Sequence, residues 1–134
     1  MIRAILAAFA SAVNVEIGLT PTAAKPVFGL PVATVPSATI GVAAFGPGEE
    51  SRVSDGAAFG RTLSVVLTIF AASDAKLLDY VADLDTLYAT DSLIVSGVEV
   101  DVRWGQAVLP EPDAEMDKTL HYQIQQPVTF SWGL

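Results

Sequence analysis

The chain has no cysteine and a single histidine among its 134 residues. Without cysteine there is no disulfide framework and no thiolate chemistry, so nothing indicates an oxidising compartment. The one histidine, His121, shares the polar face of an extended stretch with Thr119 and Gln123, and we interpret it as a surface residue. A lone imidazole makes a poor site for a transition metal. We therefore expect no metal site and no cofactor.

Basic residues are also scarce. The chain carries 7 Lys and Arg against 15 Asp and Glu, which gives a net charge of −8. Proteins that hold nucleic acid neutralise its phosphates with clustered Lys and Arg, so this composition argues against tight nucleic-acid binding. It is compatible with the wall of a channel through which DNA slides without sticking.

Long hydrophobic runs are absent as well. No stretch approaches the ~20 apolar residues that a membrane-spanning helix needs, so we expect no membrane partner. Apolar residues nevertheless make up 51% of the chain, slightly more than in ordinary globular proteins. Two explanations stay open: a compact domain that stands alone, or a subunit whose neighbours cover part of its apolar surface.

The sequence contains no catalytic motif. There is no Gly-x-Ser-x-Gly nucleophile elbow, and the Gly-Pro-Gly at 46–48 lacks the Gly-Lys-Ser/Thr end of a phosphate-binding loop. Asp113, Glu115 and Asp117 alternate as at the start of a calcium loop, but Lys118 and Ile124 stand where that loop needs a glycine and a closing carboxylate. We predict no catalytic residue and a protein that is not an enzyme.

The most regular pattern lies at the C-terminal end, over residues 118–132. Apolar and polar residues alternate there, as in a β-strand with one buried face and one wet face. Gln126 interrupts the apolar row and Pro127 cannot donate a ladder hydrogen bond, so we expect a bulge or bend at this point. The alternating apolar residues are Leu120, Tyr122, Ile124, Val128, Phe130 and Trp132.

The N-terminal residues 2–13 are expected to form an amphipathic helix that stops near Asn14. The apolar spacing i, i+3, i+4, i+7 and i+11 marks one helical face. The same stretch, with Arg3 and many alanines, imitates a secretory signal with small-residue cleavage sites. A signal core needs no such face, so we favour a structural helix. The residues of the face are Ile2, Ile5, Leu6, Phe9 and Val13.

Three further strands are expected, over residues 37–45, 61–72 and 92–104. In the first, Ile40, Val42 and Ala44 share one face, and the Gly-Pro-Gly at 46–48 ends the strand. The second is apolar on both faces, which is typical of a central strand. In the third, Gly97 marks a bulge.

A second helix is expected over residues 74–89. Ser73 and Asp74 stand at its beginning, and their side-chain oxygens can accept hydrogen bonds from the unpaired N–H groups of its first turn. One stripe of this helix is apolar and should pack on the sheet. The stripe consists of Leu77, Leu78, Val81, Leu84 and Tyr88.

The element order is helix, strand, strand, helix, strand, strand. It predicts an α+β fold: a mixed or antiparallel sheet of about four to five strands, with two helices packed on one face. The whole chain, residues 1–134, is long enough for a single domain and too short for two comfortable ones. Two loops, 46–60 and 105–117, exceed the common connection length of about 4–6 residues, and such loops are often functional.

The residues that stand out are candidates for a subunit interface or a channel lumen. Trp104 and Trp132 end strands on apolar faces, where core packing and an interface anchor are both typical roles of tryptophan. Charged loop residues such as Glu49 could pair with Arg61 or Arg103 of a neighbouring subunit. The full set is Glu49, Glu50, Arg52, Arg61, Arg103, Trp104, Glu111, Asp113, Glu115 and Trp132.

Several stretches together point to a family. They are the helix at 2–13, Val35-Pro36-Ser37 leading into the strand 38–44, the acidic loop 46–60, and the C-terminal strand 119–132. The strand Leu63-Ser64-Val65-Val66-Leu67-Thr68-Ile69-Phe70 passes directly into the helix Asp74-Ala75-Lys76-Leu77-Leu78-Asp79-Tyr80-Val81. Across nearly its whole length, the chain resembles the tail terminator (tail completion) proteins of long-tailed bacteriophages, the family that includes the phage lambda tail terminator.

The resemblance implies a structural virion protein that is assembled in the host cytoplasm. It implies a homohexameric ring that stops growth of the tail tube and joins it to the head-side connector. The implied partners are further copies of the chain, the tail tube protein and the connector or neck protein, while DNA passes through the ring without specific binding. Relatives of the same fold occur in the head–tail neck, so a neck or connector protein is the alternative.

Two rival classes remain open. One is a small acidic secreted binding module, which only the Arg3- and alanine-rich start supports. The other is a hydrolase that uses the acidic residues 113–117. Processing before Val13 in the native host would favour the first, and loss of activity on Asp113→Asn would favour the second.

Overall fold

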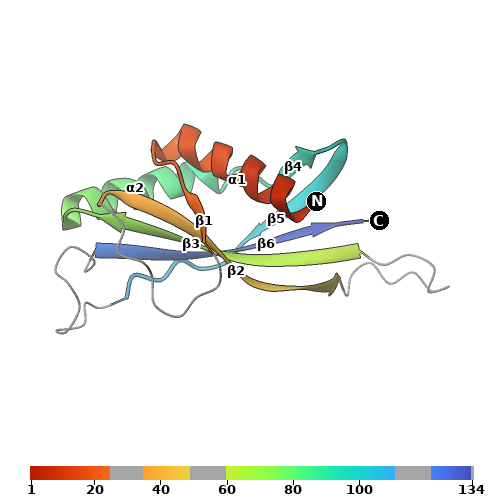
Figure 1. Cartoon of the computed structure of the whole chain (residues 1–134). Coiled ribbons are helices and arrows are strands. Elements are labelled where there is room, and N and C mark those ends of the chain that lie inside the picture. The colour runs from red at the N-terminus through yellow and green to blue at the C-terminus, as the bar shows by residue number, and fades with distance from the viewer. Residues whose placement is uncertain (25–34, 49–59, 111–121, 134) are drawn as a thin grey trace.

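Two layers make up the structure: a β-sheet and a pair of helices that cover one of its faces (Figure 1). The computed structural model describes residues 1–24, 35–48, 60–110 and 122–133. The predicted α+β class, with both helices on one face, is confirmed. The elements are α1 (Ile2–Ile17), β1 (Thr22–Ala24), β2 (Ser37–Gly48), β3 (Gly60–Ala71), α2 (Asp74–Leu87), β4 (Ser92–Val95), β5 (Val98–Trp104) and β6 (Tyr122–Trp132).

The sheet has the strand order β1-β2-β3-β6-β5-β4. Strands β2 to β6 are antiparallel to their neighbours, and the short β1 adds a parallel edge to β2. The pairing of β3 with β6 runs without interruption from Arg61↔Trp132 to Ala71↔Tyr122. The chain's C-terminal strand therefore lies in the interior of the sheet, and β3 is central, as predicted. Phe70, on the face of β3 that the helices do not cover, is 1% exposed.

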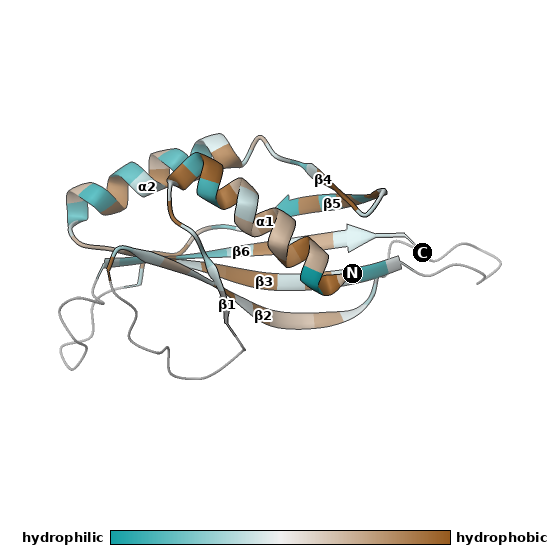
Figure 2. Cartoon of the chain, turned by 45° about the horizontal axis from the view of Figure 1, so that its top comes forward, coloured by the Kyte–Doolittle hydropathy of each residue, from teal (hydrophilic) through white to brown (hydrophobic). Residues whose placement is uncertain are grey.

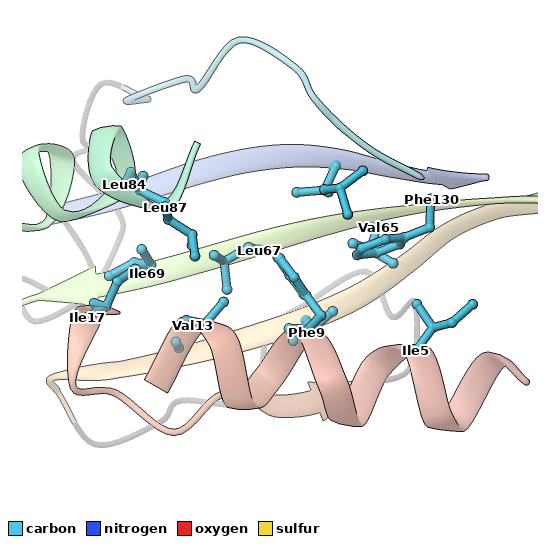
Figure 3. Packing of buried hydrophobic residues seen from close by; sticks show 14 of the residues in the cluster. Ile5, Phe9, Val13, Ile17, Val65, Leu67, Ile69, Leu84, Leu87 and Phe130 are labelled. Atoms are coloured by element: carbon cyan, nitrogen blue, oxygen red, sulfur yellow. The ribbon is translucent and has the colours of Figure 1, made fainter. Parts of the chain in front are cut away.

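The main core lies between α1 and the middle of the sheet (Figure 3). Phe9 is its centre: its ring meets Phe130 edge-on at 5.2 Å between centroids and lies 5.8 Å from the ring of Trp104. A single stripe of α1 makes these contacts because the buried residues recur every four positions. That stripe is Ile5, Phe9, Val13 and Ile17, and it packs toward Leu63, Val65, Leu67 and Ile69 of β3.

The alternation predicted for the C-terminal strand is confirmed over β6, but the bulge predicted near Pro127 is wrong. The register continues through Leu67↔Gln126 and Val66↔Pro127 without a shift. In an antiparallel strand the N and O atoms of one residue face the same neighbour. The Pro127 carbonyl accepts from Gly105 N at 2.9 Å, so the missing N–H faces the β5 side and the ladder to β3 loses nothing.

Helix α1 is longer than predicted. Asn14 does not stop it, because Ile17 continues the buried stripe and adds one more turn. The helix ends at Gly18, which adopts the left-handed conformation at φ 73° and donates from its N–H to the Asn14 carbonyl at 2.9 Å. Glycine takes this conformation without the steric cost that a side chain brings.

The stretch 92–104 is a hairpin and not a single strand with a bulge. Ser96 and Gly97 have φ values of 51° and 77°, and they turn the chain between β4 and β5, with Val95 opposite Val98. A two-residue turn with both φ positive matches the twist of the strands it joins. Apolar residues stand on both sides of the turn, at Ile94 and Val95 and then at Val98, Val100 and Val102, so the sequence resembles one continuous strand.

Strand β2 continues past its predicted end, through Pro47 to Gly48. Among the described strands, β1 pairs with residues 39–41 of β2 and β3 alone pairs with its far end, and an edge tolerates proline. A register shift between Val42 and Ala44 marks a bulge in β2. Ala44 therefore lies on the other face from Val42, contrary to the predicted common face.

Helix α2 begins as predicted, with the Ser73 hydroxyl accepting from Lys76 N at 3.3 Å. Its buried residues are Leu77, Leu84 and Leu87. The predicted stripe is wrong at two positions, because Leu78 is 65% exposed and Val81 is 36% exposed. Both lie on a flank of α2 that the sheet does not cover.

The position of Phe9 generates a stability prediction. Phe9→Ala removes a ring that contacts two other aromatic rings at 1% exposure, and we expect the free energy of unfolding to fall by about 3–5 kcal/mol. Val15→Ala, on the same helix but 81% exposed, should change it by less than about 0.5 kcal/mol. Urea denaturation of both variants measures the difference, and equal effects would place the core elsewhere.

Candidate functional site

The strongest candidate for a functional surface lies at the end of the sheet where the two termini meet. There β3 begins, β6 ends and the first turn of α1 lies above them (Figure 2). Together they line an open hollow of about 440 Å³. We call it the arginine–aromatic end and define it by its lining residues: Met1, Ile2, Arg3, Phe45, Arg61 and Trp132.

The bulge in β2 places Phe45 in this hollow. Side chains alternate between faces along a strand, so one extra residue reverses the face of every residue that follows. After the bulge, Phe45 pairs with Leu63 of the helix-covered face. Its ring stacks on Trp132 with centroids 6.4 Å apart and an interplanar angle of 29°. Phe45 remains 53% exposed, while Trp132 beneath it is 8% exposed.

Two arginines flank the rings. Arg61 lies directly opposite Trp132 in the β3–β6 register and donates from Nη1 to the Gly60 carbonyl at 3.1 Å. Arg3 projects from the first turn of α1 into the lining. An exposed aromatic ring beside guanidinium groups is typical of protein–protein contact sites. The described lining combines apolar and aromatic side chains with two guanidinium groups.

The structure separates the residues that the sequence suggested. Arg61 and Trp132 come together at the arginine–aromatic end. Arg103 is exposed and pairs with Thr129 on the sheet face away from the helices. The acidic and basic loop candidates Glu49, Glu50, Arg52, Glu111, Asp113 and Glu115, with His121, lie outside the described residues.

Trp104 is partly buried and packs against the core. Its ring packs 5.2 Å from Tyr88 and 5.8 Å from Phe9, and its Nε1 donates to the Thr90 carbonyl at 2.8 Å. Of the two roles left open for this tryptophan, core packing applies.

Sequence reasoning missed Phe45 and Arg3. Phe45 was taken as the end of a regular strand, and the bulge that turns it toward the helices falls among the small residues Ala43 and Ala44, which give no pattern signal. Arg3 was weighed only as part of a signal-like start. The available clue was its place two residues before Ile5, the first buried residue of α1, which puts it at the beginning of a packed helix.

A buried polar cluster lies nearby, under the C-terminal end of α2. The Gln126 side chain is 0% exposed. Its Nε2 donates to the carbonyls of Gly105 at 2.7 Å and Pro127 at 2.8 Å, and its Oε1 accepts from the Tyr88 hydroxyl. Both N–H donors of the amide and its oxygen have partners inside the protein, as buried polar groups in native structures usually do.

The same cluster fixes a close approach of two backbones. A Cβ added at Gly105 would lie 3.1 Å from the Pro127 Cβ, closer than nearly all real Cβ contacts, so the proline would have to shift slightly to admit it. Burial raises the pKa of the Tyr88 hydroxyl above its ordinary value, and the negative charge of Asp85 adds to the increase. The protonated hydroxyl is thereby retained as the donor to Gln126.

Other classes of site find no support in the described part of the chain. Among those residues, no group of three or more His, Cys, Asp or Glu side chains is placed to hold a metal ion. Neither described helix combines the length and the apolar character needed to cross a membrane. Comparison with models of known protein families gave no match, and comparison with curated proteins found no similar protein.

The cluster predicts a coupling between two residues. Gln126→Leu removes the acceptor of the Tyr88 hydroxyl and one donor each from the Gly105 and Pro127 carbonyls, and we expect a loss of about 1–3 kcal/mol in the free energy of unfolding. Tyr88→Phe alone should cost about 1 kcal/mol. The double variant should lose less than the sum of the two, because one hydrogen bond is counted in both. Strict additivity would contradict the contact.

A pH dependence follows from the Tyr88 pKa. The pKa of the Tyr88 hydroxyl is higher in the folded state than in the unfolded state. Its contribution to the free energy of unfolding is therefore fully present below the unfolded pKa of about 10, and it is lost as the pH rises through the folded pKa. The stability difference between the native chain and Tyr88→Phe should therefore shrink at high pH. Tyr80→Phe, on the same helix, is the matched control and should leave the high-pH loss in place. Urea titrations from pH 8 upward measure both.

Proposed function

We propose that the chain is a tail terminator of a long-tailed bacteriophage: a structural subunit that forms a closed ring on the tail tube and joins it to the head-side connector. The observation that carries the proposal is the exposed Phe45 stacked on Trp132 between two arginines. This is a surface built for contact with another protein. The α+β fold with two helices on one face agrees with the resemblance seen in the sequence, although fold alone does not fix function.

The charge of the chain suits the second part of the role. A subunit that lines a DNA conduit benefits from negative walls, because they do not bind phosphates. The net charge of −8 meets that need. The acidic residues proposed to face the lumen or an axial partner are Glu49, Glu50, Glu111, Asp113 and Glu115.

Native mass spectrometry over a range of protein concentrations, with negative-stain images of the largest species, tests the ring. The expected result is a closed six-fold ring whose channel admits duplex DNA. Adding purified tail tubes then separates the two structural roles: a terminator binds the tube end and stops its growth, whereas a neck protein binds the head portal instead. A chain that binds neither would contradict the proposal.

Reversal of the loop acids tests the conduit. Glu49→Lys, Glu50→Lys and Glu111→Lys together should slow DNA passage or block head–tail joining, because they place cations where phosphates pass. We expect infectivity to fall at least about tenfold in a phage that depends on this gene. Glu16→Lys, Asp91→Lys and Glu99→Lys, all exposed elsewhere on the described surface, form the control. Equal infectivity of the two triple variants would argue against the assigned lumen.

A further inference from the structure

A second exposed surface lies on α2, at the opposite end of the molecule from the arginine–aromatic end. Leu78 and Val81 are exposed there, and Asp74 and Asp85 lie exposed on either side of them along the helix. Positions 74, 78, 81 and 85 have the spacing i, i+4, i+7 and i+11, which places them on one stripe. We call this stripe the α2 flank: Asp74, Leu78, Val81 and Asp85.

The two surfaces are complementary in chemistry. The α2 flank offers two carboxylates around two aliphatic side chains. The arginine–aromatic end offers two guanidinium groups around two rings and an open hollow of about 440 Å³. Apolar side chains that enter such a hollow supply affinity, while opposite charges steer the approach and fix the orientation. Basic residues are scarce in the described part of the chain, where only Arg3, Arg61, Lys76 and Arg103 occur, so placing two of them at one hollow concentrates positive charge there.

One molecule cannot bring its own two surfaces together. Arg61 lies at the beginning of β3, and α2 follows directly after the end of that strand at Ala71. Twelve strand residues span roughly 35–40 Å, and Figure 1 shows the first turn of α2 at the opposite end of the sheet from the N- and C-termini. Two different patches that pair between identical copies form a head-to-tail contact, which closes into a ring when the rotation allows.

We infer that the α2 flank of one copy docks into the arginine–aromatic end of the next. Leu78 and Val81 then lie against the rings of Phe45 and Trp132. Asp85 lies near Arg3, and Asp74 lies near Arg61. The inference rests on the proposed ring and adds to it the contact that closes the ring. It also accounts for the two hydrophobic residues of α2 that the sheet leaves uncovered.

Engineered cysteines test the contact directly, because the chain has none of its own. A Phe45→Cys/Leu78→Cys variant should, under mild oxidation, give a ladder of cross-linked species from dimer up to the full ring on a non-reducing gel. Phe45→Cys alone can reach only dimers. Phe45→Cys/Val15→Cys is the matched control, since Val15 is 81% exposed on the other helix. We expect at least about tenfold less material above dimer from it.

The outcomes separate the contact from the function. Rings in native mass spectra without the 45–78 ladder would overturn the contact and leave the ring proposal standing. A monomer at every concentration, with no ladder, would also overturn the contact. The tail-tube binding assay then decides the proposed function by itself, because it needs no preformed ring. Cross-linking of the 45–78 variant only to a different added phage protein would assign the α2 flank to that partner and equally overturn the contact.

A charge exchange gives an independent measurement. Arg3→Glu should lower the association constant between copies about tenfold or more at low salt, and Asp85→Lys should do the same. Combining both in one chain should restore association to within about threefold, since the charges then match again. Glu16→Lys, also on α1 and exposed, is the control and should have little effect. Failure of the double variant to recover, with each single variant folded, would contradict the pairing.

Discussion

The antiparallel pairing of β3 with β6 is the contact on which the rest of the structure depends. Its register runs unbroken from Arg61↔Trp132 to Ala71↔Tyr122, and it joins two segments that lie far apart in the sequence. Because this register decides which side chains face α1, it positions Phe130 beneath Phe9 and so anchors the helical layer. The same register sets Arg61 beside Trp132 and thereby assembles half of the arginine–aromatic end.

Much of this fold could be predicted from the sequence, because strong periodicity reports burial directly. The apolar residues of β6 alternate over most of the strand, and the apolar stripe of α1 repeats over several helical turns. In both elements the residues in these patterns are the ones that pack in the core. The failures have a common physical origin. At Ser96-Gly97 the backbone reverses direction while apolar residues continue on both sides of the turn. At the β2 bulge the side chains change faces among small residues, which give no pattern signal. The bulge predicted at Gln126 was wrong for another reason. A polar residue can occupy a core position when its polar atoms form hydrogen bonds inside the protein.

The candidate site was less predictable than the core for a related reason. Burial leaves a periodic trace in the sequence, whereas an exposed contact surface is assembled from the ends of several elements. Arg61 and Trp132 were identified as candidates by residue type alone, and Phe45 was not identified because its orientation depends on a single extra residue. Leu78 and Val81 of α2 show the converse, since a helical stripe wider than its packing surface leaves apolar residues exposed.

The bulge in β2 also bears on how such a surface can diverge. Residues before it keep their place over the core, while the residues after it, at the free edge of the sheet, take their orientation from one inserted position. Gain or loss of one residue at this point exchanges the outward and inward sets of that strand end and leaves the residues before the bulge in place. A lineage can therefore change the side chains exposed at this end of the sheet through a length change in one strand, without altering the part of that strand that precedes the bulge.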